Sequence, residues 1–152
     1  ADDLLKMLCT VIPAWRDNLE MLILSNISYP YASFNAIPGQ SQKSAAHPSS
    51  IVQQLLKAIA KCTNLEVLHL TCLHITDTLV IDVGEMLRSL SRVKELHLAG
   101  NCLTSNGMKE LSKFLGERQQ KLQVLDVTMN EEQLDDSIVK ELKLSSNYVL
   151  HD

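Results

Sequence analysis

The chain has 152 residues, 45% of them hydrophobic and 21% charged, so it can bury one core and suits one globular domain. Its formal net charge is −4 and it holds no basic run, which argues against a nucleic-acid interface. It also lacks an apolar stretch of the roughly 20 residues that cross a bilayer and the basic start of a signal peptide. The four cysteines include no C-x-x-C pair, which favours reduced thiols in an intracellular protein, cytoplasmic or nuclear.

The predicted helices carry apolar residues with a helical period. A first apolar stripe over residues 4–12 predicts a helix that stops at Pro13. Later stripes that begin at Ile51, Leu79 and Met108 predict three more helices. Each of these three positions precedes the next strand motif by 14 residues, so helices and strands alternate in a constant register.

The strand motif recurs along the chain. In "VKELHLAGNCL", residues 93–103, the apolar residues are spaced as neither an amphipathic helix nor an uninterrupted strand would space them. Copies begin at Leu19, Leu65, Val93 and Leu122, and the last two intervals are 28 and 29 residues. These copies predict strands at 21–25, 67–71, 95–99 and 124–128. A fifth copy at 139–149 follows after only 17 residues, and it predicts either a strand at 141–145 or a capping helix.

The signature L-x-x-L-x-L-x-x-N-x-L resembles the leucine-rich repeat family, in the type with about 28 residues per repeat found in ribonuclease inhibitor. Val93 takes the first leucine's place, and the resemblance covers nearly all of the chain except an insertion. It implies an α/β fold, a leucine-rich repeat solenoid with a curved parallel sheet on its concave face and helices on its convex face.

This resemblance also implies a domain organisation and a role for one polar residue. We expect a single domain over residues 1–152 and a fragment of a larger protein, because the chain opens on an apolar helix and has only four or five units. The asparagine slot holds Ile27 and Leu73 in the first two copies and Asn101 in the third. Asn101 is therefore expected to satisfy backbone groups of the neighbouring turn.

Residues between the core leucines of each strand are predicted to point out of the concave face. Apolar side chains among them indicate a partner surface, and the alternative is that flanking segments of a longer protein cover them. The central row of this face reads Ile23, His69, His97 and Asp126. The expected partner-binding residues are Met21, Val67, His69, Glu95, His97, Val124 and Asp126.

Two histidines and a carboxylate in the central row, His69, His97 and Asp126, also suggest a metal site, because these groups are zinc ligands. Neighbours on a strand surface need not converge on one point, and the sequence reveals no residue that would orient the ligands. The sequence therefore favours an ordinary exposed row, with no metal and no cofactor.

The interval between the first two copies contains an insertion, predicted to form a loop at 29–50. Its aromatic residues Tyr29, Tyr31 and Phe34 are candidates for a secondary partner contact. The alternative is a solvated loop, which a repeat fold tolerates because additional loop length costs little entropy.

No catalytic motif was found, so the chain is interpreted as non-enzymatic. The predicted function is an intracellular scaffold or adaptor that binds an unidentified protein partner on the concave face, with no nucleic acid, membrane or small-molecule substrate. Alternatives are the substrate-receptor part of a ubiquitin ligase and the ligand-sensing part of a NOD-like receptor. A GTPase-activating leucine-rich repeat protein is disfavoured, because the strongly acidic tail of that class is not seen.

Overall fold

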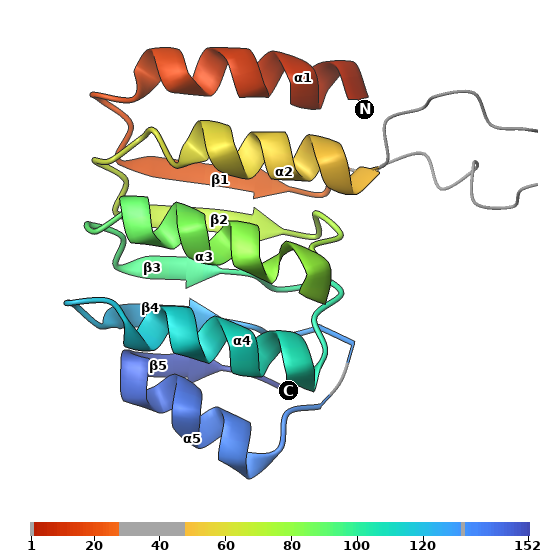
Figure 1. The fold of residues 1–152 in the computed structure, drawn as a ribbon, viewed down its shortest axis with the longest axis vertical. Coiled ribbons are helices and arrows are strands. Elements are labelled where there is room, and N and C mark those ends of the chain that lie inside the picture. The colour runs from red at the N-terminus through yellow and green to blue at the C-terminus, as the bar shows by residue number, and fades with distance from the viewer. Residues whose placement is uncertain (1, 28–47, 132) are drawn as a thin grey trace, which may run out of the picture.

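The computed structural model describes residues 2–27, 48–131 and 133–152. Within them, five parallel strands form one sheet in chain order, and the helices stack along one face of it (Figure 1). The strands are β1 (Met21–Ser25), β2 (Val67–Thr71), β3 (Glu95–His97), β4 (Leu122–Asp126) and β5 (Ser146–Leu150). The α-helices are α1 (Asp2–Val11), α2 (Pro48–Ile59), α3 (Val80–Ser89), α4 (Ser105–Gly116) and α5 (Asp136–Ser145). Short 3-10 helices, η1 (Ile12–Trp15) and η3 (Asp77–Leu79), follow α1 and precede α3.

The sheet brings equivalent positions of the motif copies side by side. Leu68 of β2 pairs with Leu96 of β3, which in turn pairs with Leu125 of β4. All three leucines are fully buried between the sheet and the helices. Because side chains alternate along a strand, the residues on either side of these leucines lie on the opposite face, which none of the described helices covers. The predicted curvature of the stack, with this face concave, remains a prediction.

The turn after β3 contains the buried Asn101. Its side-chain oxygen accepts hydrogen bonds from the backbone N–H groups of Leu73 and Ile75, each at 3.0 Å. Its amide donates to the carbonyls of Leu70 at 2.7 Å and Leu98 at 2.9 Å. Asn101 therefore joins its own turn to the preceding one, which confirms its predicted structural role.

Two strands have bounds that differ from the prediction. β3 ends at His97 instead of continuing to residue 99, and β4 covers 122–126 instead of 124–128. β4 stops at Asp126 because the carboxylate of that residue accepts hydrogen bonds from the backbone and hydroxyl of Thr128, which turns the chain. β4 begins early because Leu122 pairs with Ser146 of β5.

The predicted alternative of a strand at 141–145 is wrong, since these residues form the second half of α5. Asp135 begins this helix by accepting hydrogen bonds from the backbone of Ser137 and Ile138. Helical spacing then buries one side of α5, at Ile138, Val139, Leu142 and Ser145. The fifth strand instead follows the helix directly, as β5.

The predicted insertion loop at 29–50 overlaps α2, which begins at Pro48. A proline is well suited to the first turn of a helix, because an N–H group there would have no intrahelical partner. Tyr29, Tyr31 and Phe34 lie outside the described residues. In the described ranges, none of the helices has the length and apolar character needed to cross a membrane.

Candidate functional site

Two rows of side chains run across the open side of the sheet, and we call them the strand face. The strand pairing defines both rows, one residue per strand from β1 to β5. The first row is Met21, Val67, Glu95, Val124 and Tyr148, and the second is Ile23, His69, His97, Asp126 and Leu150. The seven predicted partner-binding residues all fall in these rows, so the structure brings them together on one surface. Their role in binding a partner remains a prediction.

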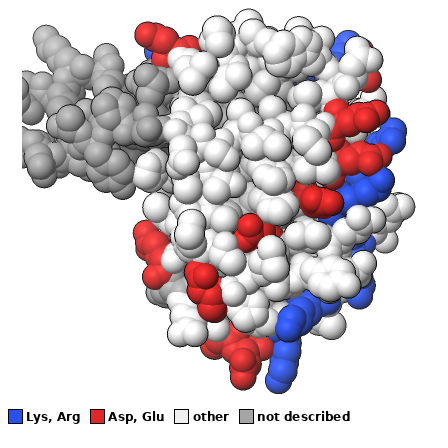
Figure 2. Space-filling view, turned by 180° about the vertical axis from the view of Figure 1, so that it is seen from behind, with Lys and Arg blue, Asp and Glu red and all other residues white. Residues whose placement is uncertain are grey.

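The two ends of the strand face are apolar and exposed. On β1, Met21 and Ile23 are each 55% exposed, and on β5 Tyr148 is 70% and Leu150 48% exposed. Each end holds two such side chains on one strand, and contiguous exposed apolar patches often mark interaction sites. Figure 2 shows this side as mostly uncharged, with acidic groups near its middle and Lys and Arg along one edge.

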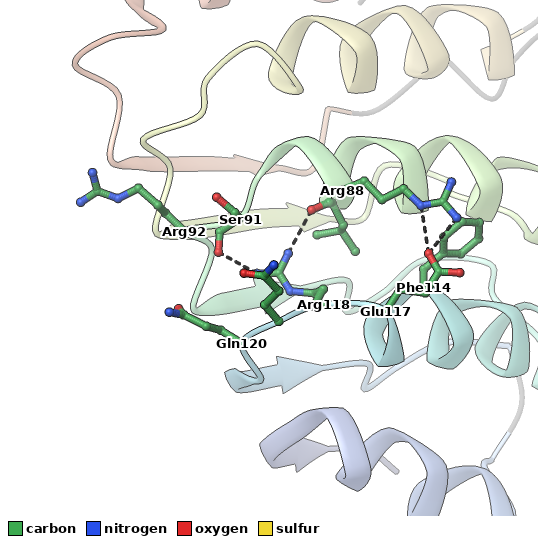
Figure 3. Close-up of a pocket in the computed structure, with 9 residues that line it drawn as sticks. Arg88, Ser91, Arg92, Phe114, Glu117, Arg118 and Gln120 are labelled. Atoms are coloured by element: carbon green, nitrogen blue, oxygen red, sulfur yellow. Dashed lines mark hydrogen bonds and ion pairs between the residues drawn. The ribbon is translucent and has the colours of Figure 1, made fainter.

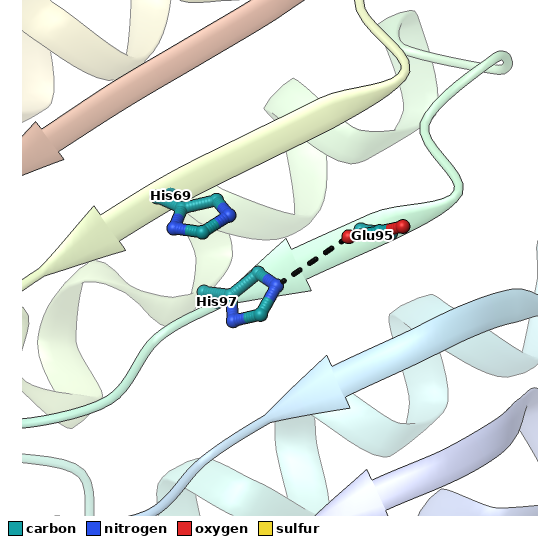
Figure 4. A group of neighbouring side chains, drawn as sticks. All are labelled: His69, Glu95 and His97. Carbon is teal, nitrogen blue, oxygen red and sulfur yellow. Dashed lines mark ion pairs between the residues drawn. The ribbon is translucent and has the colours of Figure 1, made fainter.

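At the centre of the strand face the two histidines lie against each other. The rings of His69 and His97 are stacked, with centroids 3.8 Å apart and planes inclined by 26°. His97 Nδ1 lies 3.2 Å from Asp126 Oδ2, and Nε2 of the same ring lies 3.8 Å from Glu95 Oε2. Figure 4 shows Glu95 and His97 on β3 and His69 on the adjacent strand β2. Ligand atoms of His69, Glu95 and His97 all lie within 4.8 Å of one another.

Asp126 is held firmly beside His97. Its Oδ1 atom accepts hydrogen bonds from the backbone N–H of Thr128 at 3.1 Å and from its hydroxyl at 2.8 Å. Burial alone would raise the pKa of Asp126, but the hydrogen bonds from Thr128 and His97 outweigh burial and leave the pKa below its ordinary value. The carboxylate therefore stays ionised near neutral pH and can accept a hydrogen bond from Nδ1–H of His97.

His69 is less basic than an ordinary histidine. Burial and the proximity of His97 lower the pKa of His69, while Glu95 and Asp126 oppose this change. The neutral imidazole is consequently favoured at pH 7, so the ring offers one donor nitrogen and one acceptor nitrogen.

The comparisons with known proteins agree with this arrangement. Residues 92–112, which include β3 and Asn101, match the family model described as Leucine Rich repeat. The chain contains a leucine-rich repeat over these residues. No curated protein sequence matches it significantly.

A solved structure has a fold similar to that of the whole repeat array. It is the tropomodulin C-terminal domain from Caenorhabditis elegans, which superimposes with a TM-score of 0.70 and 11% sequence identity. The match covers 97% of this chain and 82% of that one. At such low identity the likeness concerns the fold alone.

A groove on the helical side lies where the ends of α3 and α4 meet (Figure 3). Arg118 donates hydrogen bonds there to the carbonyls of Leu87 and Leu90, at 3.0 and 3.1 Å, and of Val93, at 2.7 Å. Arg88 donates to Glu117 and lies 5.0 Å from the centre of the Phe114 ring. The groove is therefore a contact between two repeats, since both guanidinium groups already bind protein groups.

Sequence reasoning did not include Tyr148 and Leu150 among the expected binding residues. It placed the candidate strand of the fifth copy at 141–145, five residues too early, where the structure has the end of α5. Tyr148 and Leu150 therefore fell outside the predicted strand. The sequence carries no alternation that would have found them, because Tyr148, Val149 and Leu150 are all apolar, and only the structure half-buries Val149 and exposes its two neighbours along the strand.

Proposed function

We propose that this chain is a non-enzymatic protein-interaction module that binds a protein partner on the strand face. The observation that carries the proposal is the pair of exposed apolar ends, on β1 and β5, on either side of a polar centre. Such a surface combines apolar anchors with groups that form directional contacts, the combination found at binding hot spots. We further propose that this face is the concave side of a curved repeat array, which acts as a scaffold or adaptor.

The chemistry of the strand face restricts the partner. Its ten residues include the carboxylates Glu95 and Asp126 and no Lys or Arg. Four strand spacings of about 4.8 Å separate the two apolar ends, so the face is roughly 19 Å across. A partner segment that carries two apolar side chains at about this separation, with a basic residue between them, would complement it in shape and charge.

The backbone of the strand face is well suited to binding without large rearrangement. Each strand is hydrogen-bonded to its neighbours, and the leucines beneath it are buried. Side chains on such a sheet are positioned before the partner arrives, which reduces the entropy lost on binding. We therefore expect the backbone of the sheet to keep its position when the partner binds.

The proposal is tested with peptides selected from a random library for binding to the intact chain. Replacing both Met21 and Tyr148 by Asp should weaken binding at least tenfold, because each change puts a charge into an apolar contact. Glu95→Lys, and His69→Ala combined with His97→Ala, should weaken binding of peptides that contain a basic residue. Affinity is measured by fluorescence anisotropy, and circular dichroism confirms that every variant is folded.

The matched control is a pair of exposed lysines on α4, Lys109 and Lys113, changed together to Glu. These residues lie on the helical side, so the change should leave affinity within twofold of the original. If the lysine pair abolished binding of the selected peptides and the strand-face variants did not, the helical side would be the binding surface and the proposal would be wrong.

A further inference from the structure

We propose that His69, Glu95 and His97 form a binding site for a divalent transition-metal ion, with zinc the expected ion. In the described part of the chain, these three side chains bring two imidazole nitrogens and a carboxylate oxygen within 4.8 Å of one another. Imidazole and carboxylate are the ligand types of zinc sites that use two histidines and one glutamate. This site goes beyond protein binding on the strand face and does not depend on it.

The pairing of the strands explains why the three ligands converge. Glu95 and His97 lie two residues apart on β3, so their side chains project from the same side of the sheet. His69 is the direct neighbour of His97 on β2. The sequence left convergence open, because adjacent positions on a strand surface can point apart, whereas the observed side chains lie close together (Figure 4).

A second carboxylate orients the central ligand. Asp126 lies 3.2 Å from Nδ1 of His97 and is itself held by Thr128. In the tautomer whose Nδ1–H donates a hydrogen bond to Asp126, the free lone pair of the ring is on Nε2. Metal-bound histidines commonly have this carboxylate partner on their other nitrogen, which fixes the ring orientation and increases its basicity. The sequence alone did not reveal this partner.

The Nε2 atom of His97 has no hydrogen-bond partner although it is buried. Its neighbour is the Glu95 carboxylate oxygen at 3.8 Å, and a cation between the two atoms would satisfy both. A zinc ion about 2.1 Å from each atom in tetrahedral geometry would hold them about 3.4 Å apart. A shift of a few tenths of an ångström in the half-buried Glu95 side chain closes that difference.

The His69 ring must turn before it can serve as the third ligand. It is stacked on His97, so it presents its face to that ring and not a nitrogen lone pair to the point between His97 and Glu95. Rotation about its side-chain torsions would replace the stack by a metal–nitrogen bond. The fourth tetrahedral position would then be open to water or to a group from a binding partner.

The test is titration of the intact chain with zinc chloride, in a non-chelating buffer with a reductant, followed by calorimetry. One ion per chain should bind, and His97→Ala or His69→Ala should reduce its affinity at least a hundredfold. Asp126→Asn should weaken binding by about 10- to 100-fold, as expected for the loss of an orienting partner. His151→Ala removes an exposed histidine near the C-terminus and is the matched control, with affinity unchanged.

Nitrogen-15 spectra of the histidine rings provide a direct second measurement. Zinc should shift the Nε2 resonance of His97 and remove the ring-current shifts that the stack with His69 causes. Glu95→Gln removes one ligand charge at a half-buried position, and it supplies a folded test if a histidine variant does not fold. Absence of zinc binding, or binding that survives loss of both histidines or disappears after alkylation of the cysteines, would overturn the proposal.

Discussion

At the scale of single residues, the chain reverses direction after β3 through Gly100. Its φ of +66° lies in the left-handed region, where a side chain is unfavourable. A methyl group at this position would also lie 2.5 Å from Sγ of Cys72, the equivalent residue of the preceding repeat. The equivalent residues Asn26, Cys72 and Met129 adopt a similar φ of 50–55° with side chains, so the close contact with Cys72 is the stronger reason for a glycine at this position.

We expect Gly100→Ala to lower the free energy of unfolding by about 2–3 kcal/mol, measured by urea denaturation. Adding Cys72→Ala should recover the part of this loss that comes from the sulfur contact and leave the part caused by φ. The control is Gly116→Ala at the end of α4, where an added methyl group meets its nearest atom at 3.9 Å. This change should be neutral or stabilising, because Ala favours helix more than Gly does. Equal losses for both substitutions would contradict the argument.

At the scale of elements, polar contacts that the apolar pattern does not contain set the ends of several helices and strands. Arg118, which follows α4, donates to carbonyls at the end of α3 and so links consecutive repeats. Asp126 ends β4 through Thr128, and Asp135 begins α5 through Ser137 and Ile138. Such side chains decide where an element stops, whereas the leucines decide what it packs against.

The cap of α5 should make stability depend on pH in the acid range. Hydrogen bonds from Ser137 and Ile138 lower the pKa of Asp135 below its ordinary value of 3.8. A folded-state pKa below the unfolded one means that the cap stabilises fully above about pH 4, and the benefit disappears as pH falls through the folded-state pKa.

Asp135→Asn keeps a capping side chain but removes the titration. We expect its melting temperature to be close to that of the original chain at pH 7 and to fall less steeply between pH 4 and pH 2. Asp135→Ala should melt at a lower temperature at pH 7, because it loses the cap itself. Thermal melts followed by circular dichroism provide the comparison, and parallel pH curves for the Asn variant and the original chain would show that the cap does not titrate as argued.

At the scale of the whole molecule, the repeats form a linear array in which each strand pairs only with its neighbours in the chain order β1 to β5. The free energy of unfolding of such an array is the sum of the small stability of each unit and the stability contributed by the contacts between neighbouring units. The buried leucines of adjacent strands make those contacts, with Leu96 of β3 between Leu68 and Leu125. A defect in a central unit should therefore affect the units on both sides.

We expect Leu96→Ala to cost about 2–5 kcal/mol of unfolding free energy, because it leaves a cavity at a fully buried site. Hydrogen exchange should show faster exchange in β2 and β4 as well as in β3. Leu144→Ala is the matched control, since Leu144 on α5 is 72% exposed and its loss should change stability by less than about 0.5 kcal/mol. Faster exchange confined to β3 would argue against coupling between repeats.

The repeat spacing in the sequence was enough to predict parallel strands alternating with helices, because the same apolar slots recur at Leu65, Val93 and Leu122. The pattern also predicted which residues share the strand face, since alternation along a strand depends only on local geometry. Even the structural role of Asn101 followed from its position in the motif.

Only the tertiary structure decided the fifth strand and the geometry of the histidines. The pattern at 139–149 fits a strand motif and also buries one side of a helix, and this ambiguity is resolved by the pairing of Leu122 with Ser146. The contacts of His97 with His69 and Asp126 depend on side-chain rotations between neighbouring strands, which spacing along a chain does not specify. Periodic burial is encoded locally, whereas strand pairing and side-chain convergence arise only when distant segments meet.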